Sequence, residues 1–298
     1  MEPLDLPRLP ESAPAPYGAG AFPSPDILAR AETLEWIERR AFQSLFCHAS
    51  RSTQATLGIR FFEKGNLFGG FCGRIDVLSL NRVLGLGQPP DSFEALESAM
   101  DMGFRSGSAR VFLPVLPGPV GARAEARLSD QGMPRHNHWM RLSLRLEGSF
   151  HPGYPRVRES LPVAALGRDR ADEFGTLAAR TFGMPAEAAA LLADSVGMPG
   201  WAHVGATWNG TLVGAGALYR EGSVCWLGYG VVREDFRSRG VHAALIGERL
   251  KEAQRLGCAI ASAETADWVE GRPAPSMRNL LRFGFEPLYR RPNYRLDL

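Results

Sequence analysis

Lysine, net charge and long apolar runs are scarce in this 298-residue chain, and each scarcity argues against a class of protein. Lys64 and Lys251 are the only lysines, and the formal net charge is only +2, from 34 basic and 32 acidic residues. Duplex-binding proteins usually carry a marked basic excess, so we expect no nucleic-acid partner. No apolar run approaches the roughly 18 residues of a membrane span, so we expect no membrane association.

Cysteine is also scarce. Cys47, Cys72, Cys225 and Cys258 lie far apart and lack any C-x-x-C spacing, so we expect free thiols in a reducing compartment. The N-terminus has neither the basic start nor the apolar stretch of a signal peptide, which together with the free thiols predicts a cytoplasmic protein. We expect no metal, because the pair in His136-Asn137-His138 has no third ligand nearby.

The residues that are present describe an average globular protein, with 45% hydrophobic and 22% charged residues. Its length predicts about two domains. Seven prolines in the first 25 residues predict an extended arm over 1–25. A stretch rich in Gly, Ser and Pro predicts a linker over 148–156, between domains at 26–147 and 157–298.

The apolar patterns of the two halves predict a similar order of helices and strands. In the first half, a helix over 27–49 precedes a hairpin of strands 56–62 and 67–72. In the second half, helices precede a hairpin of strands 201–208 and 212–219, whose Asn-Gly turn suits type I′. This alternation predicts an α/β class with a mixed sheet, built as two copies of one fold.

One strand–loop–helix segment carries the strongest chemical signal. The strand ending at Val232 is followed by Arg237-Ser238-Arg239-Gly240, and a helix begins at Val241. Amide groups at a helix N-terminus bind phosphate, and a glycine there lets a ligand approach the main chain. Two arginines add positive charge at the same place.

This segment resembles the acetyl-CoA signature of the GCN5-related N-acetyltransferase (GNAT) superfamily, Q/R-x-x-G-x-G/A after a strand. A second stretch, from Ser276 to Phe285, resembles the family's later helix that ends in Gly-Phe. The resemblance covers about 156–298 and implies two GNAT-like domains, each a mixed, mostly antiparallel twisted sheet flanked by helices.

The resemblance also implies acetyl-CoA as co-substrate and gives roles to individual residues. The main chain of Gly230, Val231 and Val232 would pair with the pantetheine arm. Ser276 and Asn279 would lie near the thiol. The pyrophosphate would be held by the loop residues Arg237, Ser238, Arg239, Gly240, Val241, His242 and Ala243.

Two positions depart from the family pattern. His242 replaces a small residue, so its side chain must point away from the phosphates or contact them. Leu280 stands where many members have a tyrosine that protonates the departing thiolate, so that acid is absent or supplied elsewhere.

Acetyl transfer to an amine also needs a base, because the attacking nitrogen must be neutral. Glu264, on the fifth strand of the second half, is our first candidate, with a solvated or salt-bridged glutamate as the alternative. Tyr229 would act as an acid or line the acceptor pocket, unless it is a core aromatic residue. His203, Tyr294 and Asp267 are weaker candidates.

The first half lacks the phosphate signature. Its strand 81–87 runs into Gln88-Pro89-Pro90, and proline has no amide hydrogen to offer a phosphate. We therefore predict a degenerate copy that does not bind CoA and instead packs against the second half or shapes its cleft.

We therefore predict an N-acetyltransferase that moves an acetyl group from acetyl-CoA to a primary amine, on a small molecule or a peptide. Direct attack in a ternary complex is what the resemblance to the GNAT superfamily implies. A mycothiol-synthase-like acyltransferase is one alternative. A CoA-binding scaffold without catalysis is another. The sequence leaves a monomer and a homodimer equally open.

Overall fold

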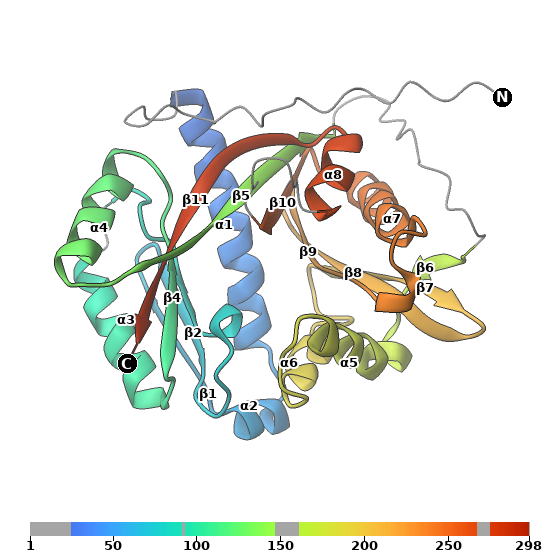
Figure 1. Ribbon diagram of the computed structural model, residues 1–298, viewed down its shortest axis with the longest axis horizontal. Helices are drawn as coiled ribbons and strands as arrows, with labels where there is room; N and C mark the ends of the chain where they lie inside the picture. Colours follow the sequence, from blue (N-terminus) through green and yellow to red (C-terminus); the bar gives the residue numbers. More distant parts are fainter. Residues whose placement is uncertain (1–24, 91–92, 147–160, 267–274, 298) are drawn as a thin grey trace.

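The computed structural model describes residues 25–90, 93–146, 161–266 and 275–297, and they build one sheet of eleven strands with helices on both faces (Figure 1). In spatial order the strands are β1-β2-β3-β4-β11-β5-β10-β9-β8-β7-β6. Their bounds are β1 Ile59–Lys64, β2 Leu67–Cys72, β3 Arg82–Leu84, β4 Arg110–Pro114, β5 Arg135–Arg145, β6 Val163–Ala165, β7 Trp201–Trp208, β8 Thr211–Glu221, β9 Val224–Val232, β10 Ile260–Ala266 and β11 Glu286–Asp297.

The helices form two layers, because successive strand residues point to opposite faces of the sheet. On β9, Trp226 packs with α1, α2, α5 and α6, whereas Leu227 packs with α7 and α8. On β3, Leu84 belongs to the first of these layers and Val83 packs with α3 and α4. The helix bounds are α1 Pro25–Cys47, α2 Arg51–Leu57, α3 Phe93–Ser106, α4 Pro119–Asp130, α5 Ala171–Thr181, α6 Ala188–Asp194, α7 Val241–Arg255 and α8 Pro275–Arg282.

The two halves exchange their last strands. β11 lies between β4 and β5 of the first half, and β5 in turn pairs with β10 of the second half. The expected fold class, a mixed and mostly antiparallel α/β sheet, is confirmed. The sheet is continuous between the halves, and their division at 148–156 stays a prediction. The linker and most of the 1–25 arm lie outside the described residues.

Only two pairs of strands in this sheet are parallel, β3 with β4 and β9 with β10. β9 and β10 pair from Ile260↔Val224 to Ala263↔Leu227, yet β9 continues to Val232 and β10 to Ala266. The ladder therefore ends in the middle of both strands, and they part from that point.

One local expectation was wrong. Residues 56 and 57, expected at the start of a strand, end the short helix α2, and β1 begins at Ile59. The Ser50 hydroxyl accepts from the Thr53 N–H and caps the helix, and Gly58 ends it at φ 64°. The Asn209-Gly210 turn is confirmed, with positive φ at both residues, as type I′ requires.

Candidate active site

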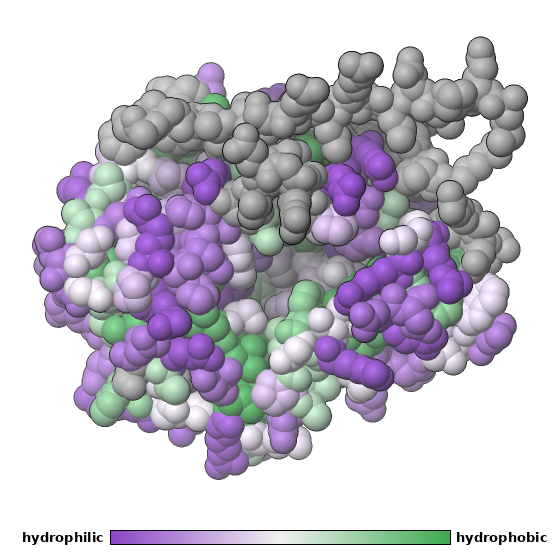
Figure 2. All heavy atoms as spheres, viewed as in Figure 1, coloured by the Kyte–Doolittle hydropathy of each residue, from purple (hydrophilic) through white to green (hydrophobic). Residues whose placement is uncertain are grey.

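A cavity of about 700 Å³ opens where β9 and β10 part, and its walls come from both halves of the chain. In Figure 2 the surface is hollowed near the middle of this face. The cavity reaches both layers, since Met184 lies after α5 on one face of the sheet and Ile246 lies in α7 on the other. It thus passes through the sheet, which gives two ligands separate approaches to one centre.

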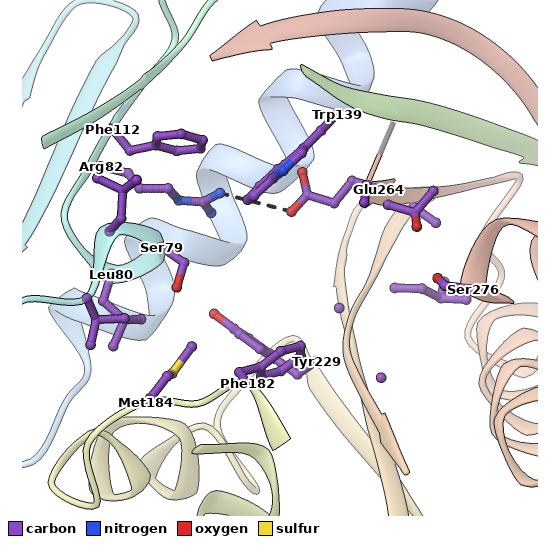
Figure 3. A pocket seen from close by; sticks show the side chains of 18 of the residues that line it. Ser79, Leu80, Arg82, Phe112, Trp139, Phe182, Met184, Tyr229, Glu264 and Ser276 are labelled. Carbon is purple, nitrogen blue, oxygen red and sulfur yellow. Dashed lines mark ion pairs between the residues drawn. The ribbon is translucent and has the colours of Figure 1, made fainter. Parts of the chain in front are cut away.

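Glu264 stands at this centre as the first residue of β10 beyond the ladder with β9. Its Oε2 accepts from Arg141 Nη1 at 3.0 Å and from Arg291 Nη2 at 2.8 Å. Its Oε1 lies 4.0 Å from Arg82 Nη1, the ion pair drawn in Figure 3. One carboxylate oxygen is thus held by two arginines, and the other has only the more distant Arg82 as an ionic partner.

These groups belong to a buried charged cluster of three carboxylates and three guanidinium groups beneath α1. Within it, Arg291 Nη1 lies 3.0 Å from Glu35 Oε2 and also contacts Glu38. The arginines come from β3, β5 and β11, so exchanged strands supply two of them. The members are Glu35, Glu38, Glu264, Arg82, Arg141 and Arg291.

The cluster separates the pKa values of its carboxyl groups. Burial raises the pKa of Glu264, and the neighbouring charge of Glu38 raises it further, against the opposing charges of the arginines. Burial would also raise the pKa of Glu38, but the charges of Arg291, Arg141 and Arg82 outweigh it and lower that pKa. Glu38 therefore stays ionised as a structural partner, while Glu264 has the elevated pKa of a useful proton acceptor.

Tyr229 faces Glu264 across the cavity from a bulge in β9. β8 pairs Ala217 with Gly228 and Ala215 with Val231, so one residue of β8 opposes both Tyr229 and Gly230. The bulge holds Tyr229 at φ 49°, an uncommon angle for a residue with a side chain. Its hydroxyl points into the cavity (Figure 3), and burial raises its pKa.

The expected phosphate loop lies between β9 and α7, after the 3₁₀ turn η3 Glu234–Phe236. Ser238 has φ 61° and Gly240 has φ 85° as the N-cap of α7, so the chain reverses sharply before the helix. Arg237 and Ser238 are exposed, and the Arg239 guanidinium lies 4.9 Å from the Phe236 ring. Val241 and Ala243 are buried on the inner side of α7.

Gly230, Val231 and Val232 follow the end of the β9–β10 ladder, at the edge of β9 that faces away from β8. Val231 and Val232 point their side chains into the apolar clusters on either face. This edge of β9 therefore offers main-chain groups, rather than side chains, to a ligand.

His242 turns inward, away from the loop. Its Nε2 lies 3.2 Å from where a Cβ on Gly230 would stand, and its Nδ1 is 3.1 Å from Asn279 Nδ2. Because an amide nitrogen only donates, Nδ1 accepts and the hydrogen lies on Nε2. Burial and the charge of Arg249 lower the pKa of His242 to about 4, so the ring is neutral at pH 7. The second signature helix thus holds this ring in place, with Ser276 lining the cavity beside it.

Sequence reasoning missed Arg249, a second cavity-lining cation whose guanidinium is buried beneath β9. It donates to three backbone carbonyls, those of Leu245, Ala217 and Gly228, at 3.1–3.2 Å. Burial lowers its pKa to about 10, so it is charged at neutral pH. The glycines of β8 and β9 were the available signal, since Gly216 and Gly230 leave room for its side chain.

The aromatic walls on the α1 face were missed as well. Phe112 of β4 and Trp139 of β5 come from the first half, whereas Phe182 and Met184 follow α5 (Figure 3). The turn η1 Leu78–Leu80 completes this chamber from below. Sequence pattern alone does not bring these segments together, because they belong to separate elements of both halves of the chain.

The weaker candidates lie elsewhere. His203 is buried in the core, where its Nε2 is 2.9 Å from Ser195 Oγ, and it does not line the cavity. Tyr294 contacts Glu125 and Arg135 near α4. Asp267 falls outside the described residues.

The four cysteines are free. Within the described ranges, no group of three or more metal-ligating side chains comes together. None of the helices there is both long and apolar enough to cross a membrane.

Comparison with known proteins agrees with this geometry. Residues 173–285 match the acetyltransferase (GNAT) family. A GCN5-related N-acetyltransferase from Kribbella flavida is 18% identical with a TM-score of 0.55, over 82% of this chain and 93% of that one. One from Sphaerobacter thermophilus is 14% identical with a TM-score of 0.54, over 80% and 76%.

A tandem GNAT protein from the clavulanic acid biosynthesis pathway is 19% identical with a TM-score of 0.50, over 72% of this chain and 74% of that one. No curated protein matches the chain. At these identities the solved structures establish the fold, and the family match covers the part of the second half that holds the β9–α7 loop and α8.

Proposed function

We propose that this chain, whose second half matches the acetyltransferase (GNAT) family, transfers an acetyl group from acetyl-CoA to a primary amine. The observation that carries the proposal is the cavity through the sheet between β9 and β10, with Glu264 at its centre. Two ligands can enter from opposite faces and meet there, as direct attack in a ternary complex requires.

The acyl donor enters from the α7 side. The pyrophosphate contacts the loop at Arg237, Ser238, Arg239 and Gly240 and the first amides of α7, where the helix dipole favours negative charge. The pantetheine arm lies along the edge of β9 at 230–232. Its amides pair with that edge as a strand would, because β10 has already separated from it.

The acceptor amine enters from the α1 side and meets Glu264. The Oε1 oxygen accepts the proton that the nitrogen loses, directly or through water, while Arg141 and Arg291 fix the carboxylate by its other oxygen. Tyr229 bounds the same space and orients the amine with its hydroxyl.

The walls favour an amine with an apolar body and a single charge. Phe112, Trp139, Phe182 and Met184 offer apolar and aromatic contact. The two carboxylates that line the described cavity, Asp76 and Glu264, are both paired with arginine, so a polycation finds no unpaired counter-charge there. A monoamine with an aromatic or alkyl group suits this chamber better than a polyamine or an aminoglycoside.

The first experiment is thermal unfolding with and without about 1 mM acetyl-CoA. A ligand that binds only the folded state stabilises it by roughly 2.7 kcal/mol at a hundredfold excess over Kd. We expect a clear rise in midpoint for the wild type and none for Gly240→Asp, which places a negative charge in the loop. Gly222→Asp is the matched control, because it imposes a similar backbone strain at φ 59° in a distant turn with open space around it.

A rise that survives in Gly240→Asp would contradict this placement of the pyrophosphate. A panel of single-charge aromatic and alkyl amines, polyamines and peptides then tests transfer by release of free thiol. Acetyl-CoA binding with no transfer to any amine would favour the scaffold alternative. Transfer to an amino-sugar thiol precursor alone would favour the mycothiol-synthase-like one.

A further inference from the structure

Arg249 is a buried cation with no carboxylate beside it. Arg249 is 3% exposed. Its Nε and Nη1 donate three hydrogen bonds, all of them to main-chain carbonyls. Nη2 makes no hydrogen bond with any described residue and lies beside Gly230, which lines the cavity together with Arg249. An uncompensated buried charge is strongly unfavourable, so a group kept in this state calls for an anion that the cavity can bring.

The sheet is shaped around this side chain. A Cβ on Gly216 would lie 2.8 Å from the guanidinium carbon, and one on Gly230 would lie 3.3 Å from Nη2. Both strands thus carry glycine where the guanidinium passes beneath them. The charge stands directly under the point at which β9 and β10 separate, since Nη1 also donates to the Gly228 carbonyl.

The position along β9 selects which part of the donor it meets. Arg249 Nη1 donates to the carbonyl of Gly228, the first residue of β9 beyond its ladder with β10, and Glu264 is the corresponding residue of β10. The pyrophosphate loop follows only after Val232, at the far end of β9, so the guanidinium lies level with the reacting groups rather than with the pyrophosphate. An extended pantetheine arm that starts at the loop and follows β9 brings its sulfur to this level.

We propose that Arg249 binds the sulfur of CoA and stabilises the thiolate that leaves during acetyl transfer. The inference rests on the proposed function. In this step the amine nitrogen bonds to the thioester carbonyl carbon, and the carbon–sulfur bond breaks. Its electron pair stays on sulfur as a thiolate beside Nη2, and the nitrogen's proton passes to Glu264.

The neighbouring groups support this assignment. His242 packs against Gly230 beside the guanidinium and is held by Asn279, so its uncharged ring offers the sulfur an Nε2–H donor but no second positive charge. Glu264, which also lines the cavity, forms its ion pairs with Arg141 and Arg291 and not with Arg249. Arg249 is thus the cation on the donor side whose Nη2 is left for a ligand.

The test uses CoA itself and needs no acceptor. The far-ultraviolet absorbance of a thiolate is titrated against pH for CoA bound to the full chain, with acetyl-CoA and desulfo-CoA as ligands that cannot ionise there. A cation within about 4–6 Å lowers an acid's pKa by roughly 1–3 units, so bound CoA should titrate that far below free CoA. Above that pKa, CoA should bind roughly tenfold or more tightly than desulfo-CoA.

Arg249→Met should abolish both effects, and Arg249→Lys should restore them in part. Arg220→Met is the matched control, because Arg220 also donates to main-chain carbonyls but lies outside the cavity lining. If Arg249→Met fails to fold, Arg249→Gln takes its place, and an ordinary thiol pKa of CoA bound to the wild type overturns the role of Arg249 without any variant.

The outcomes separate the two proposals. CoA that binds with an ordinary thiol pKa overturns the role of Arg249 and leaves the proposed function standing. A thiolate that persists in Arg249→Met overturns it too. If acetyl-CoA, CoA and desulfo-CoA all fail to bind, the proposed function itself fails and this inference fails with it.

Discussion

The two parallel strand pairs of the sheet show what distinguishes the halves. In the second half, β9 and β10 stop pairing at Leu227 and Ala263 and open the cavity. In the first half, β3 and β4 stay joined beyond their ends, because Leu86 bridges Val115 and the Leu116 N–H donates to the Leu86 carbonyl. One pair leaves a strand edge unpaired, where the proposed pantetheine arm would lie, and the other does not.

The loops that follow these strands differ in the same sense. The loop before α7 gives a left-handed Gly240 and then helix amides, whereas the loop before α3 contains Pro89 and Pro90. The loop before α3 is also bonded to neighbouring segments, since Gln88 Nε2 donates to the Glu32 carbonyl of α1 and Asn66 Nδ2 donates to the Pro89 carbonyl. This agrees with a first half that does not bind CoA.

What the first half contributes lies on the other face. It supplies Phe112 and Trp139 to the acceptor chamber and Arg82 and Arg141 to the charged cluster around Glu264. The expectation that it shapes the cleft therefore gains a physical basis, because the exchanged strands carry these side chains to the centre. The first half thus contributes to the cavity through packing and charge pairing, while its degenerate-copy origin stays a prediction.

The largest expected effect is on the carboxylate that faces the cavity. Glu264→Gln removes the proton acceptor and should lower acetyl transfer about 10²- to 10⁴-fold, with acetyl-CoA binding retained. In wild type, activity should rise with pH through a pKa above the ordinary range of a glutamate, because burial and Glu38 raise the pKa of Glu264.

The measurement is a pH–rate profile with the best amine of the panel. The rising limb should vanish in Glu264→Gln. If the rising limb of the profile is unchanged in Glu264→Gln, another residue is the base. The proposed difference in role between Glu264 and Glu38 would then lose its support.

The next largest effect is expected on stability, from a change to Glu38, the structural carboxylate of the first half. Glu38→Gln leaves the buried charges of Arg82, Arg141 and Arg291 under-compensated, which typically costs about 3–5 kcal/mol. Urea unfolding at pH 7 measures this cost. A loss under 1 kcal/mol would mean that water or another group compensates the arginines, and the cluster would not unite the halves.

A third prediction concerns how the stability of the folded protein depends on pH, to which the buried histidines of the second half contribute. Burial lowers the pKa of His203 to about 3, whereas His48 and His136 of the first half are exposed. Below pH 6.5 the unfolded chain binds a proton that folded His203 does not, so stability falls as the pH falls, by on the order of 2 kcal/mol at pH 4.5.

Urea unfolding at pH 7 and at pH 4.5 tests this. His203→Phe, which keeps an aromatic ring beside Phe174, should flatten the dependence. His242 contributes with the same sign, and Glu38, whose pKa is lowered, loses its contribution only at more acidic pH. Equal slopes in both proteins would contradict the role of His203.

The smallest effect concerns the first loop. Gln88→Ala should leave the Kd for acetyl-CoA unchanged within about twofold and cost about 1 kcal/mol of stability through the lost hydrogen bond to Glu32. Isothermal titration measures the Kd. A marked loss of affinity would show that the first half also binds the donor.

Local sequence patterns predicted much of the secondary structure of this chain. Helix and strand periods predicted α1, α5, α7 and the two hairpins, because each buries one face against a sheet. The strand–glycine–helix segment located the loop at Gly240, since left-handed backbone and free amides are local properties. α2 was missed although its cap Ser50 is visible, because Thr56 and Leu57 also suit a strand.

The centre of the site was out of reach of such signals. Arg249 looks like an ordinary helix residue until β8 and β9 bring Gly216 and Gly230 above it. The sequence placed Glu264 on a strand as a candidate base. It did not reveal that Glu264 pairs with Arg141 and Arg291, because those residues lie on the strands that the two halves exchange.

By itself the sequence determined most of the helices and strands, the glycine turn before α7 and the prolines in the loop before α3. These depend on residues within about ten positions of one another. The tertiary structure decided that β5 and β11 change places, that β9 and β10 part at Leu227, and that a charged cluster surrounds Glu264. Those features arise from contacts between segments that are distant in the sequence, where packing and charge pairing select the partners.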